Sequence, residues 1–330
     1  MPFAGDPLSE PSEPVVGDLL IIGGAEDKLG RRSVLTEFVR RAGGSEARIA
    51  VVPTASSLGP EIVDVYAALF TRLGAAEVYG VRPQDRAQAS DPAVVSELDR
   101  ATGIFMTGGN QLKLSTVIAG TPFGDAILDA RARGVTVAGT SAGASIQSSH
   151  MVAFGPGGAT AKQRMTQVAA GLGLLQDCVV DQHFAQRNRY GRLLMIVSQS
   201  PQLLGIGVDE DTAAVVTRTP EGTDLMEVVG KGAVTVLDGR DMVTDAHAAR
   251  EHRPILASGV VLHALPAGSR FDLTTRRLVP TARPVDPTEA DELALANRDL
   301  GKMARDIAAD DASPSALRRR IARRNRGATP

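Results

Sequence analysis

The first two hundred residues alternate between short apolar runs and longer amphipathic stretches. The runs at Leu19–Ile22, 48–53 and 135–139 indicate strands, whereas residues 61–73 and 123–133 show the apolar spacing of helices. Strands that are apolar throughout and alternate with helices are typical of a parallel sheet covered on both faces. The pattern therefore predicts an α/β fold built on a doubly wound, mostly parallel sheet.

After about residue 205 the apolar runs become shorter and more closely spaced. Turn residues such as Pro220, Gly222 and Gly239 separate them, as is typical of antiparallel strands. No linker precedes this part of the chain. We therefore expect it to be a β-rich extension of the same domain.

The two ends of the chain differ from the rest. Residues 1–16 contain four prolines, which fix φ and donate no hydrogen bond, so we expect a flexible leader. Residues 281–330 lack β-type runs and contain six arginines within 318–326. We expect an appended helical, Arg-rich tail there, and one α/β domain at residues 17–280.

Composition excludes several classes of protein. Apolar residues make up 43% of the chain, and the formal net charge of −2 creates no overall attraction to nucleic acid or membrane. Aromatic residues reach only 3%, too few for a base-stacking platform, and no apolar run is long enough to span a bilayer. The single cysteine, Cys178, excludes an internal disulfide framework and a multi-cysteine zinc site. We expect a cytoplasmic protein without metal or cofactor, meeting nucleic acid only weakly through its tail.

A candidate nucleophile lies where the strand at 135–139 meets the next predicted helix, which begins at Ala142. Residues 139–143 read Gly-Thr-Ser-Ala-Gly, the pattern of a nucleophile elbow centred on Ser141. Such a turn needs small flanking residues because the serine is held in a strained conformation with its hydroxyl exposed. The first helical N–H, that of Ala142, would face an oxyanion. The alternative is a glycine-rich turn with a helix-capping serine.

A serine hydroxyl needs a base, and His183 is the best placed of the five histidines. It follows the apolar run at 178–180 in a polar stretch with Asp181, Gln182 and three arginines. Polar groups this dense at the carboxyl edge of a parallel sheet favour a site. The alternative is a histidine that caps a helix beside solvated arginines.

The base in turn needs an acid that orients it. Three acids, Asp209, Glu210 and Asp211, end the apolar run at 205–208. Alternation along an extended chain sends Asp209 and Glu210 to opposite sides, so only one of them can approach His183. The residues alone leave that choice open, as well as the alternative of a solvated acidic turn.

Two glycine pairs also follow predicted strands. Residues 107–111 read Thr-Gly-Gly-Asn-Gln, and paired glycines let the backbone approach a ligand and expose N–H groups. A phosphate loop is disfavoured because Gly-Lys-Ser/Thr and GxGxxG are both missing. Residues 23–28 read Gly-Gly-Ala-Glu-Asp-Lys, where a tight turn and a site-lining role are equally open.

Together these motifs resemble a known family. In order along the chain they are 23–28, 107–111, 139–144, 181–192 and 207–213. This is their order in the cyanophycinases, serine peptidases of peptidase family S51 with a class I glutamine amidotransferase-like fold. The match covers roughly residues 17–265, and five motifs in order make it specific.

The resemblance implies roles for individual residues. Ser141 would be the nucleophile, His183 the base and Glu210 its orienting partner, with the N–H groups of Gly109 and Ala142 as the oxyanion hole. The resemblance also implies that six polar side chains line the substrate pocket: Gln111, Asp181, Gln182, Arg187, Arg189 and Arg192.

The family also implies a substrate. Its members cut cyanophycin, a polyaspartate chain with arginine on each β-carboxyl, and release β-Asp-Arg dipeptides. They need no metal and are usually homodimers. The implied activity is that of a serine-type exopeptidase.

Three other functions remain to be weighed. A related aspartyl dipeptidase shares the elbow, but such enzymes are shorter and lack the dense arginine run. An esterase could use Ser141, Asp209 and His247, although a His-Gly-Gly-Gly oxyanion loop is missing. A non-catalytic binder of Arg-containing peptides would have no reason to keep serine, histidine and glutamate together.

Overall fold

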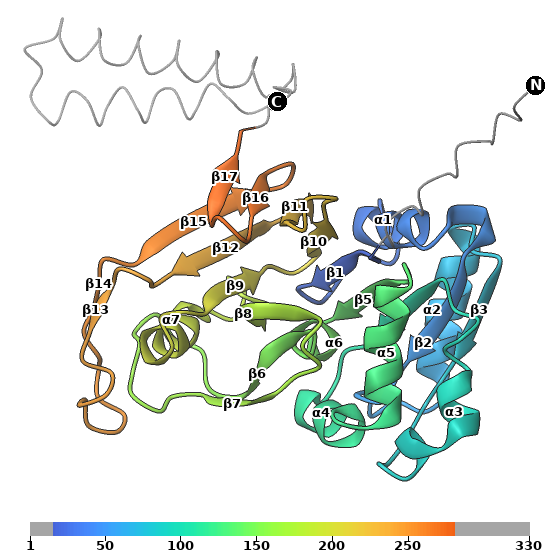
Figure 1. Cartoon of the computed structure of the whole chain (residues 1–330), viewed down its shortest axis with the longest axis horizontal. Coiled ribbons are helices and arrows are strands. Elements are labelled where there is room, and N and C mark those ends of the chain that lie inside the picture. The colour runs from blue at the N-terminus through green and yellow to red at the C-terminus, as the bar shows by residue number, and fades with distance from the viewer. Residues whose placement is uncertain (1–15, 281–330) are drawn as a thin grey trace, which may run out of the picture. The chain divides into compact units, whose positions relative to one another are not determined.

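The computed structural model describes residues 16–280, which belong to a single structural unit of the chain. A nine-stranded sheet forms its first layer (Figure 1). Five strands of this sheet are parallel: β3 (Glu77–Gly80), β2 (Arg48–Val52), β4 (Gly103–Met106), β5 (Thr136–Thr140) and β1 (Leu19–Ile22). Four more continue it in antiparallel fashion: β10 (Thr212–Arg218), β11 (Asp224–Gly230), β16 (Arg270–Asp272) and β17 (Arg277–Val279).

Helices cover the parallel part of this sheet on both faces. Leu20 and Ile22 pack against α1 (Ser33–Arg41) and α2 (Glu61–Arg72). Leu19 and Ile21, which alternate with them, face the opposite core. That core is covered by α3 (Pro92–Ser96), α4 (Gln111–Ile118) and α5 (Pro122–Ala132). The α/β prediction is confirmed, because burial on both faces requires strands that are apolar at every position.

A second, six-stranded sheet lies beside the first (Figure 1). Its strands, in spatial order, are β15 (Val261–Pro266), β12 (Ala233–Asp238), β9 (Leu204–Val208), β8 (Leu175–Gln182), β6 (Ser148–Phe154) and β7 (Gln167–Ala170). Its three central strands are parallel, and α7 (Tyr190–Gln199) packs on them. The predicted β-rich extension therefore widens both sheets, through β10–β11 and β12–β15 respectively.

The helix expected to run on from Ala142 is much shorter than the sequence predicted. Helix α6 covers only Ala142–Ser145, and the chain then enters β6, which contains His150. The Ser148 hydroxyl lies 3.0 Å from the Ser145 carbonyl oxygen and 2.9 Å from that of His150, and its one proton, donated to these carbonyls, stabilises the turn that ends the helix. This early exit carries the chain from the first sheet to the second immediately after Ser141.

The short elements complete the description. They are the 3₁₀ turns η1 (Gly44–Glu46) and η2 (Gln88–Ser90) and the small hairpin of β13 (Val243–Thr244) and β14 (Ala257–Ser258). Within residues 16–280, no helix is long and apolar enough to cross a membrane. The expected flexible leader, apart from residue 16, and the expected helical tail at 281–330 lie outside the described residues.

Candidate active site

Ser141 occupies a strained turn at the carboxyl end of β5. Its φ of 53° and ψ of −109° are rare for a residue with a side chain. Its N–H donates to the Ile22 carbonyl over 3.0 Å. The neighbouring glycines make this turn sterically feasible: a Cβ on Gly139 would lie 2.0 Å from the Gly143 carbonyl oxygen, and one on Gly143 would lie 2.2 Å from that of Met106. The small flanking residues are therefore a packing requirement of the elbow.

The His183 imidazole lies between the Ser141 hydroxyl and a carboxylate. Ser141 Oγ is 3.0 Å from His183 Nε2, and Glu210 Oε1 is 2.6 Å from His183 Nδ1. Because an ionised carboxylate only accepts hydrogen bonds, Nδ1 carries the proton and Nε2 is left to accept from the serine. This is the order of groups that activates a hydroxyl as a nucleophile.

The glycine pair after β1 holds His183 in place. The His183 N–H donates to the Gly23 carbonyl over 2.7 Å. A Cβ on Gly24 would lie 2.5 Å from His183 Nε2, so the backbone of Gly24 packs directly against the imidazole. The motif at 23–28, whose role the sequence left open, therefore lines the site. Only glycine allows this close approach.

The surroundings of His183 favour its neutral form. Burial lowers its pKa, and the positive charges of Arg187 and Arg189 act in the same direction. The hydrogen bond and charge of Glu210 oppose this, but the net pKa lies below the usual value of 6.5. The imidazole is therefore free to take a proton at neutral pH.

The three acids after β9 have three different contacts. Glu210 binds His183. Asp209 instead accepts hydrogen bonds from the N–H groups of Ala185 and Ala233, at 3.0 and 3.2 Å. Asp211 accepts from the Asp27 N–H at 2.8 Å. The geometry resolves the open choice between Asp209 and Glu210 as the histidine's neighbour, and it gives Asp209 a backbone-anchoring position.

The second glycine pair borders Ser141. A Cβ on Gly108 would lie 3.3 Å from Ser141 Cβ. At Gly109, φ is +144°, and a Cβ would lie 2.1 Å from the Ala55 carbonyl oxygen. Within residues 16–280, neither the Gly109 N–H nor the Ala142 N–H donates a hydrogen bond. These are the two donors that the sequence assigns to an oxyanion hole.

Five of the six residues expected to line the substrate pocket, all except Arg187, form a connected network. Gln182 Nε2 donates to Gln111 Oε1 over 2.7 Å. Arg189 donates to Asp181, to the Gln182 carbonyl and to the Gln182 side chain. Arg192 binds both carboxylate oxygens of Asp181, a fork geometry that favours arginine.

The residues expected to line the pocket differ in their exposure to solvent. Asp181 is completely inaccessible to solvent, and Arg192 and Arg189 are buried around it. Burial lowers the pKa of Arg189 to about 10, although the charge of Asp181 opposes this effect. Arg187, by contrast, is exposed and forms no ion pair within the described part of the chain. Asp181 is thus fully engaged by this protein's own arginines.

Glu26, a buried residue that the sequence analysis did not single out, binds the residue before Ser141. Glu26 accepts hydrogen bonds from Thr140 Oγ1 and Tyr66 Oη, both at 2.6 Å, and from Lys28 Nζ at 2.8 Å. Burial acts to raise its pKa, but Lys28 and the hydroxyl donors reverse that effect and leave the pKa lowered. Thr140 directly precedes Ser141, so the Glu26 carboxylate fixes the start of the nucleophile elbow.

A serine, a histidine and a glutamate thus meet at the carboxyl ends of β5, β8 and β9. Within residues 16–280, no group of three or more histidine, cysteine, aspartate or glutamate side chains is placed to hold a metal ion.

Comparison with known proteins gives the family. The model of peptidase family S51 matches residues 19–220, a range that includes Ser141, His183 and Glu210. The chain is 40% identical to the cyanophycinase of a Nostoc species over 265 residues, covering 79% of this chain and 87% of that one. It is 39% identical to the cyanophycinase of Geminocystis herdmanii, covering 78% and 94%.

The chain belongs to peptidase family S51, and it is a peptidase. A solved structure of a peptidase from an acI-B1 actinobacterium shares the fold, with a TM-score of 0.58 and 23% identity. The match covers 79% of this chain and 98% of that one. The expected family resemblance is confirmed.

We expect Glu210→Gln to lower kcat/KM by about 10²-fold or more, because it removes the charge that orients the imidazole and stabilises the imidazolium. The matched control is Asp209→Asn, which loses one of two backbone hydrogen bonds but leaves the imidazole contact in place, and it should reduce kcat/KM less than about tenfold. Both variants are assayed on one soluble β-Asp-Arg peptide, with folding checked by circular dichroism. A larger loss for Asp209→Asn would overturn the assignment of Glu210.

We expect Glu26→Gln to destabilise the protein by about 1–3 kcal/mol at pH 7, since one amide oxygen cannot serve all three donors. The folded pKa of Glu26 is below its unfolded value. Its stabilisation is therefore present above the unfolded pKa and lost as pH falls through the folded pKa.

Urea unfolding of the wild type and of Glu26→Gln, at pH 7 and at about pH 4, measures the difference in their free energies of unfolding. Glu46→Gln, at an exposed position, is the control and should change stability by less than about 0.5 kcal/mol. Equal effects of the two substitutions at pH 7 would show that the Glu26 carboxylate does not anchor the elbow.

Proposed function

We propose that this peptidase degrades cyanophycin and that it does so by serine catalysis. The observation that carries the mechanism is the Ser141–His183–Glu210 arrangement, with 3.0 and 2.6 Å between successive groups. The observation that supports the substrate is the similarity to curated cyanophycinases over most of the chain.

The first half of the reaction forms an acyl-enzyme. Ser141 Oγ attacks the carbonyl carbon of an aspartyl peptide bond while His183 Nε2 takes the hydroxyl proton. The negative charge that develops on the carbonyl oxygen is stabilised by the N–H groups of Gly109 and Ala142. The tetrahedral adduct collapses as His183 returns the proton to the departing amine, and the C–N bond breaks.

The second half repeats these steps with water. His183 removes a proton from a water molecule that attacks the ester carbon, and then protonates Ser141 Oγ as it leaves. Glu210 remains ionised and stabilises the imidazolium in both halves. The proton balance closes, and the enzyme returns to its starting state.

Substrate recognition rests on the polar network next to His183. Each unit of cyanophycin carries a carboxylate and a guanidinium group. Arg187 is exposed and unpaired within residues 16–280, which suits it to bind a substrate carboxylate. Asp181 holds Arg189 and Arg192, so we assign it to orient the arginines of the pocket. Gln111 and Gln182 complete the polar wall.

The other functions have less support. The esterase hypothesis needs Asp209 as the acid, but that carboxylate is bound to two backbone N–H groups, and His247 is exposed near β13. A non-catalytic binder would not require a strained serine aligned with a histidine. An aspartyl dipeptidase remains the second candidate, because it would use the same three residues.

Assembly and compartment extend the proposal. A homodimer is implied by the family resemblance, and the edge strand β15 exposes Val261 and Leu262, as an interface would require. Light scattering of the purified chain measures its mass directly. The expectation of a cytoplasmic protein is tested by fractionating cells that produce it.

We expect Ser141→Ala to leave the fold intact and to lower kcat by roughly 10³-fold or more, because only the oxyanion donors and binding contacts remain. The assay follows release of β-Asp-Arg from purified cyanophycin by mass spectrometry. Ser145→Ala, at the last residue of helix α6, is the control and should keep most of the activity. Near-normal hydrolysis by Ser141→Ala would remove the serine mechanism.

We also expect kcat/KM to fall on the acid side with a midpoint below pH 6.5, since the His183 pKa is lowered and the neutral imidazole is the active form. Arg187→Gln removes a charge that lowers this pKa and should move the midpoint to higher pH. Glu210→Gln removes the groups that raise it and should move the midpoint to lower pH. Shifts in the opposite directions would show that another group controls the profile.

A further inference from the structure

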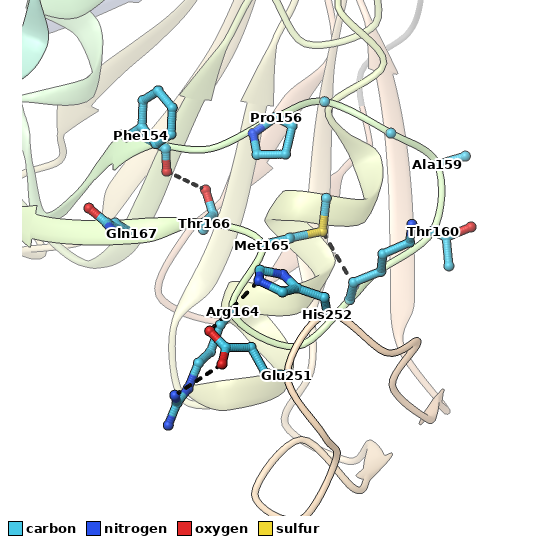
Figure 2. A pocket seen from close by; sticks show the side chains of 13 residues that line it. Phe154, Pro156, Ala159, Thr160, Arg164, Met165, Thr166, Gln167, Glu251 and His252 are labelled. Carbon is cyan, nitrogen blue, oxygen red and sulfur yellow. Dashed lines mark hydrogen bonds and ion pairs between the residues drawn. The ribbon is translucent and has the colours of Figure 1, made fainter.

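A cavity of about 650 Å³ opens outside the catalytic centre, between the loop that joins β6 to β7 and residues 251–252 (Figure 2). Its lining contains neither Ser141 nor His183. Phe154, Pro156 and Met165 supply apolar surface, whereas Arg164, Glu251 and His252 cluster together in Figure 2. Its chemistry is mixed, with both signs of charge beside an exposed aromatic ring.

Backbone hydrogen bonds hold the walls of the cavity. The N–H of Gln163 donates to the Arg253 carbonyl and the N–H of His252 donates to the Gln163 carbonyl, both over 2.9 Å. The Gln163 side chain is buried and also bonds the Ala246 carbonyl. These contacts join two loops about ninety residues apart, so the cavity is formed before any ligand arrives.

The cavity adjoins the catalytic site along β6. Gln111, in the proposed substrate network, donates to the Ala153 carbonyl over 3.2 Å, and Arg192 donates to the Gly155 carbonyl over 2.8 Å. Phe154 lies between these two anchored residues, lines the cavity and is 70% exposed. A chain leaving the catalytic site along β6 would meet this ring.

The charged groups of the cavity form only long, exposed contacts with one another, including His252 Nε2 at 3.7 Å from Glu251 Oε1. Arg164 Nη1 and Glu251 Oε2 are 3.9 Å apart, at the limit of an ion pair, and their side chains are 70% and 57% exposed. Such a pair contributes little by itself, so both charges are available to a ligand. Lys162 adds a second permanent positive charge to the lining.

We propose that this cavity is a second substrate subsite, which binds another aspartyl-arginine unit of the same cyanophycin chain. Lys162 and Arg164 bind the unit's carboxylate, Glu251 binds its guanidinium, and Phe154 packs on its aliphatic stem. The inference rests on the proposed function. Binding at two places on one polymer raises the effective concentration of the next scissile bond, an advantage that a short peptide cannot use.

The kinetic test compares two substrates. The double variant Lys162→Glu, Arg164→Glu should raise KM for soluble cyanophycin about fivefold or more and change kcat on that polymer less than about twofold. Its kcat/KM for a two-unit peptide, (β-Asp-Arg)₂, should also change less than about twofold. The matched control is Arg72→Glu, Arg133→Glu, two exposed arginines outside the cavity lining with the same change in net charge. It should leave both substrates within about twofold.

A binding test avoids catalysis. Full-length protein carrying Ser141→Ala is sedimented with insoluble cyanophycin, with and without the double variant. The double variant should lose most of the bound fraction. Phe154→Ala is a second variant that changes no charge, and it keeps the test valid if Lys162→Glu, Arg164→Glu impairs folding. It should weaken polymer binding without changing cleavage of the two-unit peptide.

The outcomes are distinct. An unchanged KM for polymer, or an equal loss on both substrates, would overturn the second subsite. A loss matched by the Arg72, Arg133 control would show that net charge alone attracts the polymer, and would also overturn it. If the wild-type protein cleaves neither substrate, the proposed function itself fails.

Discussion

The strained turn at Ser141 is the constraint on which the rest of the structure depends. Its φ of 53° persists only because Gly139 and Gly143 let the neighbouring backbone approach within distances that no Cβ would permit. Glu26 binds the side chain of Thr140 from inside the core, and the Ser141 N–H is tied to β1. The partly buried Ser141 hydroxyl is thus fixed by the packing of three strands and a buried charge.

The site joins the two sheets of the molecule. Ser141 follows a strand of the first sheet, whereas His183 and Glu210 follow β8 and β9 of the second. One contact between the sheets is made by the backbone of Gly23 and Gly24, which binds and packs against His183. Because the imidazole is buried at this junction, its pKa is lowered and its neutral form persists at neutral pH. Relative movement of the sheets would therefore disturb the Ser141–His183–Glu210 geometry directly.

Charged residues around the site divide into two groups. Asp181 is buried with Arg189 and Arg192, and the buried Glu26 carboxylate binds Thr140 next to the elbow and the partly exposed Lys28. Arg187 and the residues of the second cavity are exposed and have charges available to a ligand. The protein thus uses fully paired charges to build the site, and weakly paired charges where we propose that a zwitterionic polymer binds.

The sequence by itself determined the α/β class, the elbow at Ser141 and the motifs around His183. These features depend on the spacing of apolar residues and on short runs of adjacent residues, which can be seen in the sequence directly. It did not determine which of Asp209 and Glu210 contacts His183 without the family resemblance, nor that β6 begins so soon after the elbow. The roles of Gly24 and Glu26 also needed the tertiary structure. Gly24 meets His183, and Glu26 meets Thr140, across more than a hundred residues. The first contact depends on how the two sheets pack and the second on the pairing of β1 with β5, neither of which a local pattern specifies.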